Sequence, residues 1–320
     1  MPRTKPDESA SGFSLSPSAN SPVNPASVPL PARESGAAKT SRHRKRDRLW
    51  EKTVIVTGAS SGIGRSLCKR LVERHACRVI GVARNKERCL SLREELGDAF
   101  SYHLFDVSDE KAWQAFAARL QEENILPDIL VNNAGMLPRF CRFDRMDAAL
   151  FSQTIDVDFL SVVYACRAML PLLLRAPSPM LCNIASSAAL CPLPGVTPYA
   201  AAKAAVKSFT ESLAAEYAPD RLRVCLILPG FTLTDIFREQ KESGMRNPWL
   251  SRIAMPCKKM AGKIERALQK GKPRKVFGAD AKGMDLLYKL FPAHAARLCG
   301  NVLRLGAAAL FEDVFPTDGI

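Results

Sequence analysis

The chain has 320 residues, 47% of them hydrophobic, and a formal net charge of +14. Its ten cysteines are scattered without a Cys-x-x-Cys pair, and it has only four histidines, which argues against a zinc site or a disulfide framework. No apolar run approaches the ~18 residues that a membrane span needs, so we expect a soluble, cytoplasmic protein of globular composition.

The first 48 residues differ in composition from the rest. They are rich in Ser, Pro and Ala and include a basic run at residues 42–48. Segments with so few large apolar residues do not offset the entropy of ordering, so we expect residues 1–48 to be a disordered basic tail. The run could contact nucleic acid or anionic lipid, but no aromatic platform accompanies it, and a solvated tether with no nucleic-acid partner is the favoured interpretation.

From residue 49 onward, predicted strands and helices alternate along the chain. The expected strands are 53–57, 78–83, 102–107, 128–132, 180–185, 223–228 and 275–278. The expected helices are 62–74, 86–96, 109–122, 151–174, 199–217 and 258–270. This alternation predicts an α/β fold with a doubly wound parallel sheet of the Rossmann type, in a single domain at 49–278.

Two segments outside the alternating pattern complete the predicted organisation. Residues 231–256 contain Gly244, Pro248 and Pro256, which suits a loop over a binding cleft. Residues 279–320 are expected to form an amphipathic helical extension, with apolar residues spread over 284–311. Such a stripe is more typical of core or of contact in a homo-oligomer, while peripheral membrane contact through this helix or the basic tail is the alternative.

A glycine-rich turn follows the first predicted strand. Gly58, Gly62 and Gly64 lie where that strand ends and a helix begins. Glycine permits the tight turn and lets a pyrophosphate approach backbone amides at the positive end of the helix. The spacing in this context predicts dinucleotide binding.

The end of the second strand indicates which dinucleotide is bound. An acidic residue there would bind the ribose 2′-hydroxyl of NAD, but the chain has Ala83 followed by Arg84. An arginine suits a 2′-phosphate, so NADP(H) is favoured over NAD(H), with Arg65 as a second candidate. The alternative is that Arg84 is a solvated loop charge.

Tyr199 and Lys203 are four residues apart on a predicted helix and so share one face. A free phenol titrates near pH 10 and is a poor base at neutral pH. A neighbouring positive charge favours the phenolate, so we expect Lys203 to bring Tyr199 into the range useful for acid/base catalysis.

These residues together resemble the short-chain dehydrogenase/reductase (SDR) family over about residues 50–235. The matching motifs are Thr57-Gly58-Ala59-Ser60-Ser61-Gly62-Ile63-Gly64, Asn132-Asn133-Ala134-Gly135, Ser186, Tyr199-xxx-Lys203 and Pro229-Gly230. The resemblance implies that Tyr199 is the general acid/base, that Lys203 lowers its pKa and binds the nicotinamide ribose, and that Ser186 holds the substrate oxygen. Ser187 is a less favoured alternative to Ser186.

The resemblance also implies a set of cofactor-binding positions. They are Gly58, Ser60, Ser61, Gly62, Ile63, Gly64, Arg84, Asp106, Val107, Asn133, Ala134, Gly135, Tyr199, Lys203, Pro229, Gly230 and Thr232, with Thr234 beside the last.

One position departs from the family pattern. The family usually has asparagine in the long helix before the serine strand, and this chain has Asp158. An ionised carboxylate accepts hydrogen bonds but cannot donate them as an amide does. We expect Asp158 to belong to the catalytic group, with an altered pH dependence.

Taken together, the sequence predicts a metal-free, NADP-dependent carbonyl reductase or alcohol dehydrogenase. The chain continues about forty residues beyond the last predicted strand, and this longer end is similar to that of family members acting on lipid or steroid ketones. That resemblance implies a hydrophobic ketone or secondary alcohol as the small-molecule substrate, while an oligomer interface is the alternative role of the extension. The alternatives are a 3-oxoacyl-type reductase and a non-catalytic NADP-sensing regulator that kept the fold.

Overall fold

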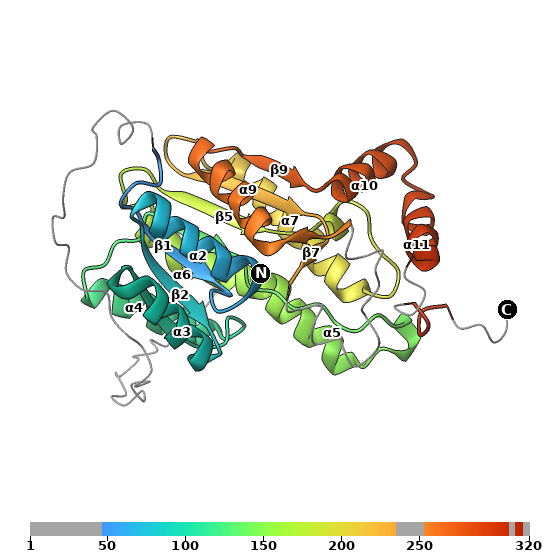
Figure 1. Ribbon diagram of the computed structural model, residues 1–320, viewed down its shortest axis with the longest axis horizontal. Coiled ribbons are helices and arrows are strands. Elements are labelled where there is room, and N and C mark those ends of the chain that lie inside the picture. Colours follow the sequence, from blue (N-terminus) through green and yellow to red (C-terminus); the bar gives the residue numbers. More distant parts are fainter. Residues whose placement is uncertain (1–46, 235–252, 307–310, 316–320) are drawn as a thin grey trace, which may run out of the picture.

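A seven-stranded parallel sheet runs through the centre of the molecule in the computed structural model, which describes residues 47–234, 253–306 and 311–315 (Figure 1). The strand order is β3-β2-β1-β4-β5-β6-β9. The strands are β1 (Thr53–Thr57), β2 (Arg78–Ala83), β3 (Phe100–Leu104), β4 (Ile129–Asn132), β5 (Met180–Ile184), β6 (Arg223–Pro229) and β9 (Arg274–Phe277). The predicted doubly wound sheet is confirmed, and its order reverses beside β1, where such sheets bind ligands.

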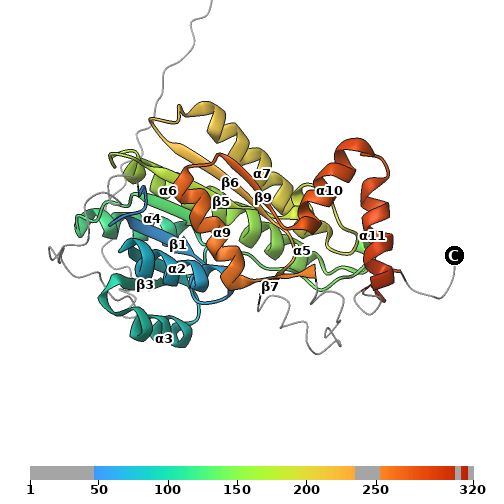
Figure 2. The same ribbon diagram turned by 45° about the horizontal axis from the view of Figure 1, so that its top comes forward.

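Helices cover both faces of the sheet (Figure 2). One layer contains α2 (Gly62–His75), α3 (Lys86–Leu96) and α9 (Cys257–Lys270), and the other contains α4 (Glu110–Glu122), α6 (Ser161–Leu173) and α7 (Thr197–Glu216). Within β1, Val54 and Val56 join the first core while Ile55 joins the second. Because both faces are buried, the strand reads as a continuous β-branched run rather than an alternating one.

Several boundaries differ from the sequence-based expectation. The third strand, expected at 102–107, is Phe100–Leu104, so Asp106 and Val107 lie in the loop beyond it. The helix expected at 151–174 starts earlier, as α5 (Ala148–Ile155), because Asp147 caps it by accepting a hydrogen bond from the Ala149 amide. A π-helical turn, η3 (Asp156–Leu160), then separates α5 from α6.

Short elements complete the connections. The 3₁₀ turns are η1 (Gly97–Ala99), η2 (Phe143–Arg145) and η4 (Ser187–Ala189). A small parallel pair that the sequence did not predict joins β7 (Thr232–Leu233) to β8 (Met255–Pro256). This pair brackets residues 235–252, so most of the loop predicted at 231–256 lies outside the described residues.

The C-terminal extension is two helices rather than one continuous stripe. These are α10 (Ala279–Leu290) and α11 (Ala295–Gly306), which stand beyond the carboxyl end of β9 (Figure 1). Pro292 lies between them, where proline interrupts a helix. Their inner side chains, among them Met284, Leu287 and Leu303, form a third apolar cluster with Phe140 and Val196.

The predicted tail lies outside the described residues as far as residue 46. At its end, Asp47 is described and its carboxylate contacts the His75 ring at 2.6 Å. The boundaries proposed at residues 48 and 278 stay predictions. Within the described ranges, no helix is long and apolar enough to cross a membrane.

Candidate active site

The glycine turn between β1 and α2 is shaped by close backbone contacts. Gly58 has φ +65°, and a Cβ there would lie 3.0 Å from the side-chain nitrogen Nδ2 of Asn133. A Cβ on Gly64 would lie 2.2 Å from the carbonyl oxygen of Gly58. Both positions therefore need glycine, the first for its left-handed backbone and the second for the close approach of helix to turn.

The helix that follows this turn begins with groups available to an anion. The side chain of the N-cap residue Ser61 makes no capping hydrogen bond, and the first turn of α2 carries no acidic residue. The free amides and positive dipole end of a helix attract phosphate. These residues fit the pyrophosphate of a dinucleotide.

The end of β4 is tied to the same turn through Thr57. The amides of Asn133 and Ala134 donate to the Thr57 hydroxyl at 2.8 and 2.9 Å. The Asn133 side chain also donates to the Thr57 carbonyl at 2.9 Å. These bonds hold residues 133–135 as one wall of the cavity that opens at the carboxyl edge of the sheet.

All four predicted catalytic residues line this cavity: Asp158, Ser186, Tyr199 and Lys203. Ser186 follows β5 and caps η4, where its hydroxyl accepts a hydrogen bond from the Ala188 amide at 3.2 Å. That bond uses an oxygen lone pair and leaves the hydroxyl proton free to donate elsewhere. Ser187, the less favoured alternative, is buried and also lines the cavity.

Tyr199 and Lys203 lie one turn apart near the start of α7, which has Pro198 in its first turn. The Lys203 ammonium is 5.7 Å from the centre of the Tyr199 ring. The two side chains thus reach the same cavity, as their spacing predicted.

Asp158 forms a buried ion pair with Lys203. The Asp158 Oδ1 atom lies 2.9 Å from Lys203 Nζ and accepts a second hydrogen bond from the Met136 amide at 3.2 Å. Asp158 is 0% and Lys203 4% exposed. The other carboxylate oxygen, Oδ2, is buried without a hydrogen-bond partner among the described residues.

These charges set the acidity of the tyrosine. Burial raises the pKa of Tyr199; Lys203 lowers it, Asp158 raises it, and a hydrogen bond from Ser186 lowers it, so that the pKa is raised overall. Burial acts to lower the pKa of Lys203, but Asp158 and Tyr199 outweigh burial and raise it. Lys203 lowers the pKa of Tyr199 as expected, but burial and Asp158 outweigh it, so the expectation that the pKa as a whole would fall was wrong.

A second cavity continues from the turn past the end of β2. Arg84 lines it, with its guanidinium 3.3 Å from the Asp106 carboxylate and its side chain 69% exposed. Arg88, in the first turn of α3, lines it too and was missed by the sequence reasoning, although it is only four residues beyond Arg84. Two arginines at this place favour a doubly charged group such as a 2′-phosphate.

Arg65, the second candidate for that phosphate, points elsewhere. Its guanidinium donates to the Arg88 carbonyl at 2.9 Å and pairs with Glu95 at 3.0 Å. It does not line either cavity. These contacts with α3 do not support the role in phosphate binding that its position just after the turn suggested.

Nearly all other predicted cofactor positions line one of these two cavities. They are Gly58, Ser60, Ser61, Gly62, Ile63, Arg84, Asp106, Val107, Asn133, Ala134, Gly135, Tyr199, Lys203, Pro229, Gly230 and Thr232, together with Thr234. Gly64 does not, and it acts through packing as described above.

Part of the first cavity is apolar. Its walls include Leu137, Phe140, Leu193, Val196 and Phe231. The C-terminal segment packs closely beside these walls: a Cβ on Gly195 would lie 2.5 Å from the side chain of Val314. No motif marked these residues, because a substrate wall assembled from several loops has no fixed spacing.

Comparison with known proteins agrees with this geometry. Residues 52–244 match the family model for short chain dehydrogenase. The chain is 33% identical over 216 residues to 3-oxoacyl-[acyl-carrier-protein] reductase FabG of Chlamydia trachomatis, covering 65% of this chain and 86% of that protein. It is 32% identical over 192 residues to a 3beta-hydroxysteroid dehydrogenase of Mediterraneibacter gnavus, covering 59% and 69% of the two chains.

A solved structure is similar as well. Serine dehydrogenase complexed with NADP+, in its closed form, superposes with a TM-score of 0.65 at 26% identity, covering 70% of this chain and 93% of that one.

Proposed function

The chain belongs to the short-chain dehydrogenase/reductase family and is an oxidoreductase acting on CH–OH or keto groups; we propose that it uses NADP(H) and a hydrophobic ketone or secondary alcohol. The single observation that carries the proposal is the convergence of Ser186, Tyr199 and Lys203 on one cavity beside a helix N-terminus that has no side-chain cap.

When bound, the nicotinamide supplies or accepts the hydride. In the reducing direction Tyr199 donates its phenolic proton to the substrate oxygen, so that hydride and proton together convert C=O to CH–OH. Ser186 donates a hydrogen bond to the same oxygen and stabilises the charge that develops there. Lys203 binds the nicotinamide ribose and keeps a positive charge beside the phenol.

Asp158 acts on Tyr199 together with Lys203. Its carboxylate holds the ammonium in place at 2.9 Å and opposes the effect of that ammonium on Tyr199. Burial and Asp158 raise the pKa of Tyr199 from an ordinary value near 10, so the phenol carries the proton that carbonyl reduction requires.

The preference for NADP(H) is supported by Arg84 and Arg88 at the second cavity and by the absence of an acidic residue at Ala83. We expect Arg84→Ala to weaken the binding of NADPH by about tenfold and the binding of NADH much less, since a hydrogen bond to a charged group is worth ~1.5–3 kcal/mol. Fluorescence titration with both cofactors measures this. Equal weakening of the two would contradict the assignment.

The apolar walls support a hydrophobic substrate. A steroid-like ketone agrees with those walls and with the name of the Mediterraneibacter relative. A 3-oxoacyl thioester is the second candidate, and the named activity of the Chlamydia relative favours it. Family members are commonly oligomeric, and we propose the same here, to be measured by light scattering.

The decisive experiment is Tyr199→Phe, which removes only the phenolic proton. We expect NADPH oxidation with steroid, acyl and small ketones to fall by at least about a hundredfold, the usual scale of general acid catalysis. Cofactor affinity should stay near that of the wild type. Turnover within a few-fold of the wild type would refute the mechanism, and NADPH binding without turnover in the wild type would favour the sensing regulator.

A further inference from the structure

The outward side of α10 and α11 carries most of the exposed large apolar side chains in the described part of the chain. They are Leu286, Leu290, Phe291, Leu298, Val302 and Leu305, which are 45% to 88% exposed. Elsewhere in that part, strongly exposed residues of this kind are isolated, as at Leu90 and Phe143. A contiguous exposed apolar patch marks an interaction site more than scattered residues do.

The exposed charges that the two helices carry beside this patch have one sign. The exposed charged residues of the two helices are Lys282, Lys289, Arg297 and Arg304. Their two acidic residues are less exposed and are engaged with the protein: Asp280 accepts from the Phe231 amide at 2.6 Å, and Asp285 pairs with Lys289 at 2.8 Å. The patch therefore has a basic border.

The spacing on α11 places apolar and basic side chains in adjacent stripes. Leu298, Val302 and Leu305 follow an i, i+4, i+7 pattern and share one side of the helix. Arg297 and Arg304 are seven residues apart and flank that side. An apolar stripe bordered by arginine and lysine is typical of helices that lie in the surface plane of a membrane.

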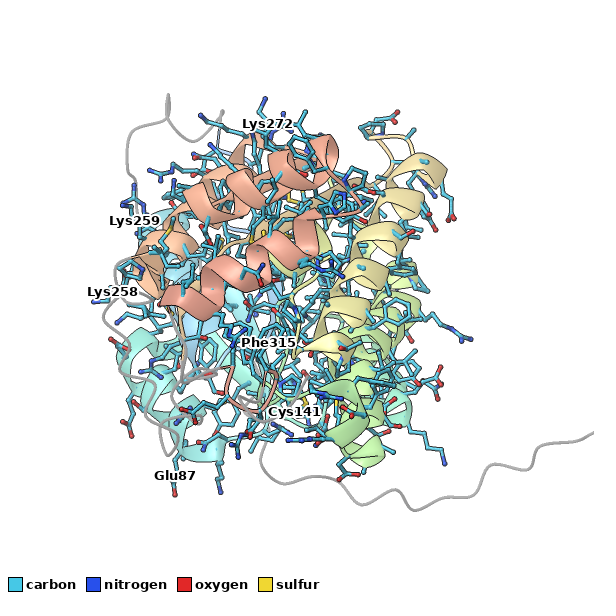
Figure 3. All side chains as sticks on the ribbon, turned by 90° about the vertical axis from the view of Figure 1, so that its right-hand side faces the viewer. Glu87, Cys141, Lys258, Lys259, Lys272 and Phe315 are labelled. Carbon is cyan, nitrogen blue, oxygen red and sulfur yellow. The ribbon has the colours of Figure 1, made fainter. Side chains whose placement is uncertain are left out.

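Viewed end-on, α10 and α11 cross the front of the molecule (Figure 3). Lys258 and Lys259 of α9 project at one edge of this view and Lys272 at the top. The inner side of the pair is fixed, because Met284 and Leu303 pack in the cluster that also contains Leu193 and Val196 of the cavity wall. The outer side is thus presented by a rigidly packed element.

We propose that this α10–α11 face docks on the surface of an anionic lipid bilayer. The apolar stripe would enter the headgroup region, and the basic residues would contact the acidic headgroups. A second copy of the chain fits less well, because a two-fold contact of this face with itself would bring like charges together. Docking is separate from the proposed chemistry, since it uses none of the cavity residues.

Vesicle sedimentation tests the proposal on the full chain. We expect binding to vesicles of equal parts phosphatidylcholine and phosphatidylglycerol, weaker binding to phosphatidylcholine alone, and loss of binding at high salt. Lys282→Gln/Arg297→Gln should weaken binding by about fivefold for each charge removed. The matched control Lys111→Gln/Arg175→Gln removes two exposed cations elsewhere and should bind like the wild type.

The apolar half is tested with Leu290→Gln/Leu305→Gln, which should lose most binding, against Leu90→Gln on α3, which should not. Tyr199→Phe should bind vesicles like the wild type, whether or not it turns over ketones. The proposal is overturned if the wild type does not sediment with anionic vesicles, or if controls and patch variants lose binding equally. It is also overturned if light scattering shows a dimer that Leu290→Gln/Leu305→Gln abolishes while vesicle binding is unchanged.

Discussion

At the scale of single residues, the acidity of Tyr199 results from opposing neighbours. Burial and Asp158 raise its pKa, while Lys203 and the hydrogen bond from Ser186 lower it. A phenol acts as the acid below its pKa and as the base above it, so reduction is lost as the pH rises through this value and oxidation is lost as the pH falls through it. Asp158 thus shifts the pH at which reduction is lost and the pH at which oxidation is lost in the same direction.

Asp158→Asn tests this control. Removing the carboxylate removes a contribution that raises the Tyr199 pKa, so the pKa should fall. The pH profile of alcohol oxidation should move to lower pH, with activity at neutral pH retained or raised, and the reduction limb should move in the same direction. Steady-state rates across the pH range in both directions measure the shift. An unchanged profile would show that Asp158 does not act on the tyrosine, and complete loss of activity would show that it has another role.

The residues of the site could be predicted from sequence to the extent that their chemistry depends on local spacing. The glycines, Ser186, Tyr199 and Lys203 lie at strand ends and on one helix face, so a one-dimensional pattern places them. The contact between Asp158 and Lys203 joins residues 45 positions apart. No spacing rule predicts that geometry, which contributes, after burial, to the raised pKa of Tyr199.

At the scale of elements, the parallel strands were predictable because each is a short apolar run between turn signals. The break of the long helix at η3 was not, since 156–160 contains no proline or glycine. The π-turn is nevertheless the element that carries Asp158 into the cavity. The two C-terminal helices were expected as one amphipathic stretch, although Pro292 within it is a sequence signal for the break that the structure shows.

A cross-link tests how α11 packs on the loop beside the site. Cys191 and Cys299 have their sulfur atoms 3.6 Å apart although they are 108 positions apart in the sequence. Burial, together with Cys299, raises the pKa of Cys191 to about 12, and Cys299 is the more exposed of the two, so we expect an oxidant to react with Cys299 first. Diamide, an azo oxidant, would take two hydrogens from the thiols and leave a disulfide.

We expect non-reducing peptide mapping to find the Cys191–Cys299 peptide before any other cross-link. Cys141 and Cys257 are similarly half-buried and provide an internal comparison. Cys299→Ser should abolish the product. Random pairing, or preferential pairing of Cys141 with Cys257, would contradict the packing of α11 described above.

At the scale of the whole molecule, chemistry and structural support lie at opposite edges of the sheet. The cavity opens where the strands end, while a polar cluster lies where they begin. There Glu265 of α9, only 2% exposed, contacts the His75 ring at 3.0 Å and forms ion pairs with Arg70 and with Arg74. Asp47 contacts the other nitrogen of His75, so the cluster joins α2, α9 and the start of the folded chain.

Replacing Glu265 should therefore destabilise the fold without altering the chemistry. Glu265→Ala leaves Arg70 and His75 facing a void, and we expect a loss of about 3 kcal/mol in the free energy of unfolding, as when a buried ion pair loses one partner.

Burial would raise the pKa of Glu265, but hydrogen bonds from His75 and Arg70 outweigh it and lower the pKa. Its charge thus stabilises the fold above the ordinary value of 4.5, and that contribution is lost as the pH falls through the lowered pKa. Urea unfolding of wild type and Glu265→Gln should accordingly differ at neutral pH and converge in acid, while Glu73→Ala, an exposed glutamate on α2, should stay within about 0.5 kcal/mol of the wild type. A constant difference at every pH would show that the side chain acts through packing and that its charge contributes nothing.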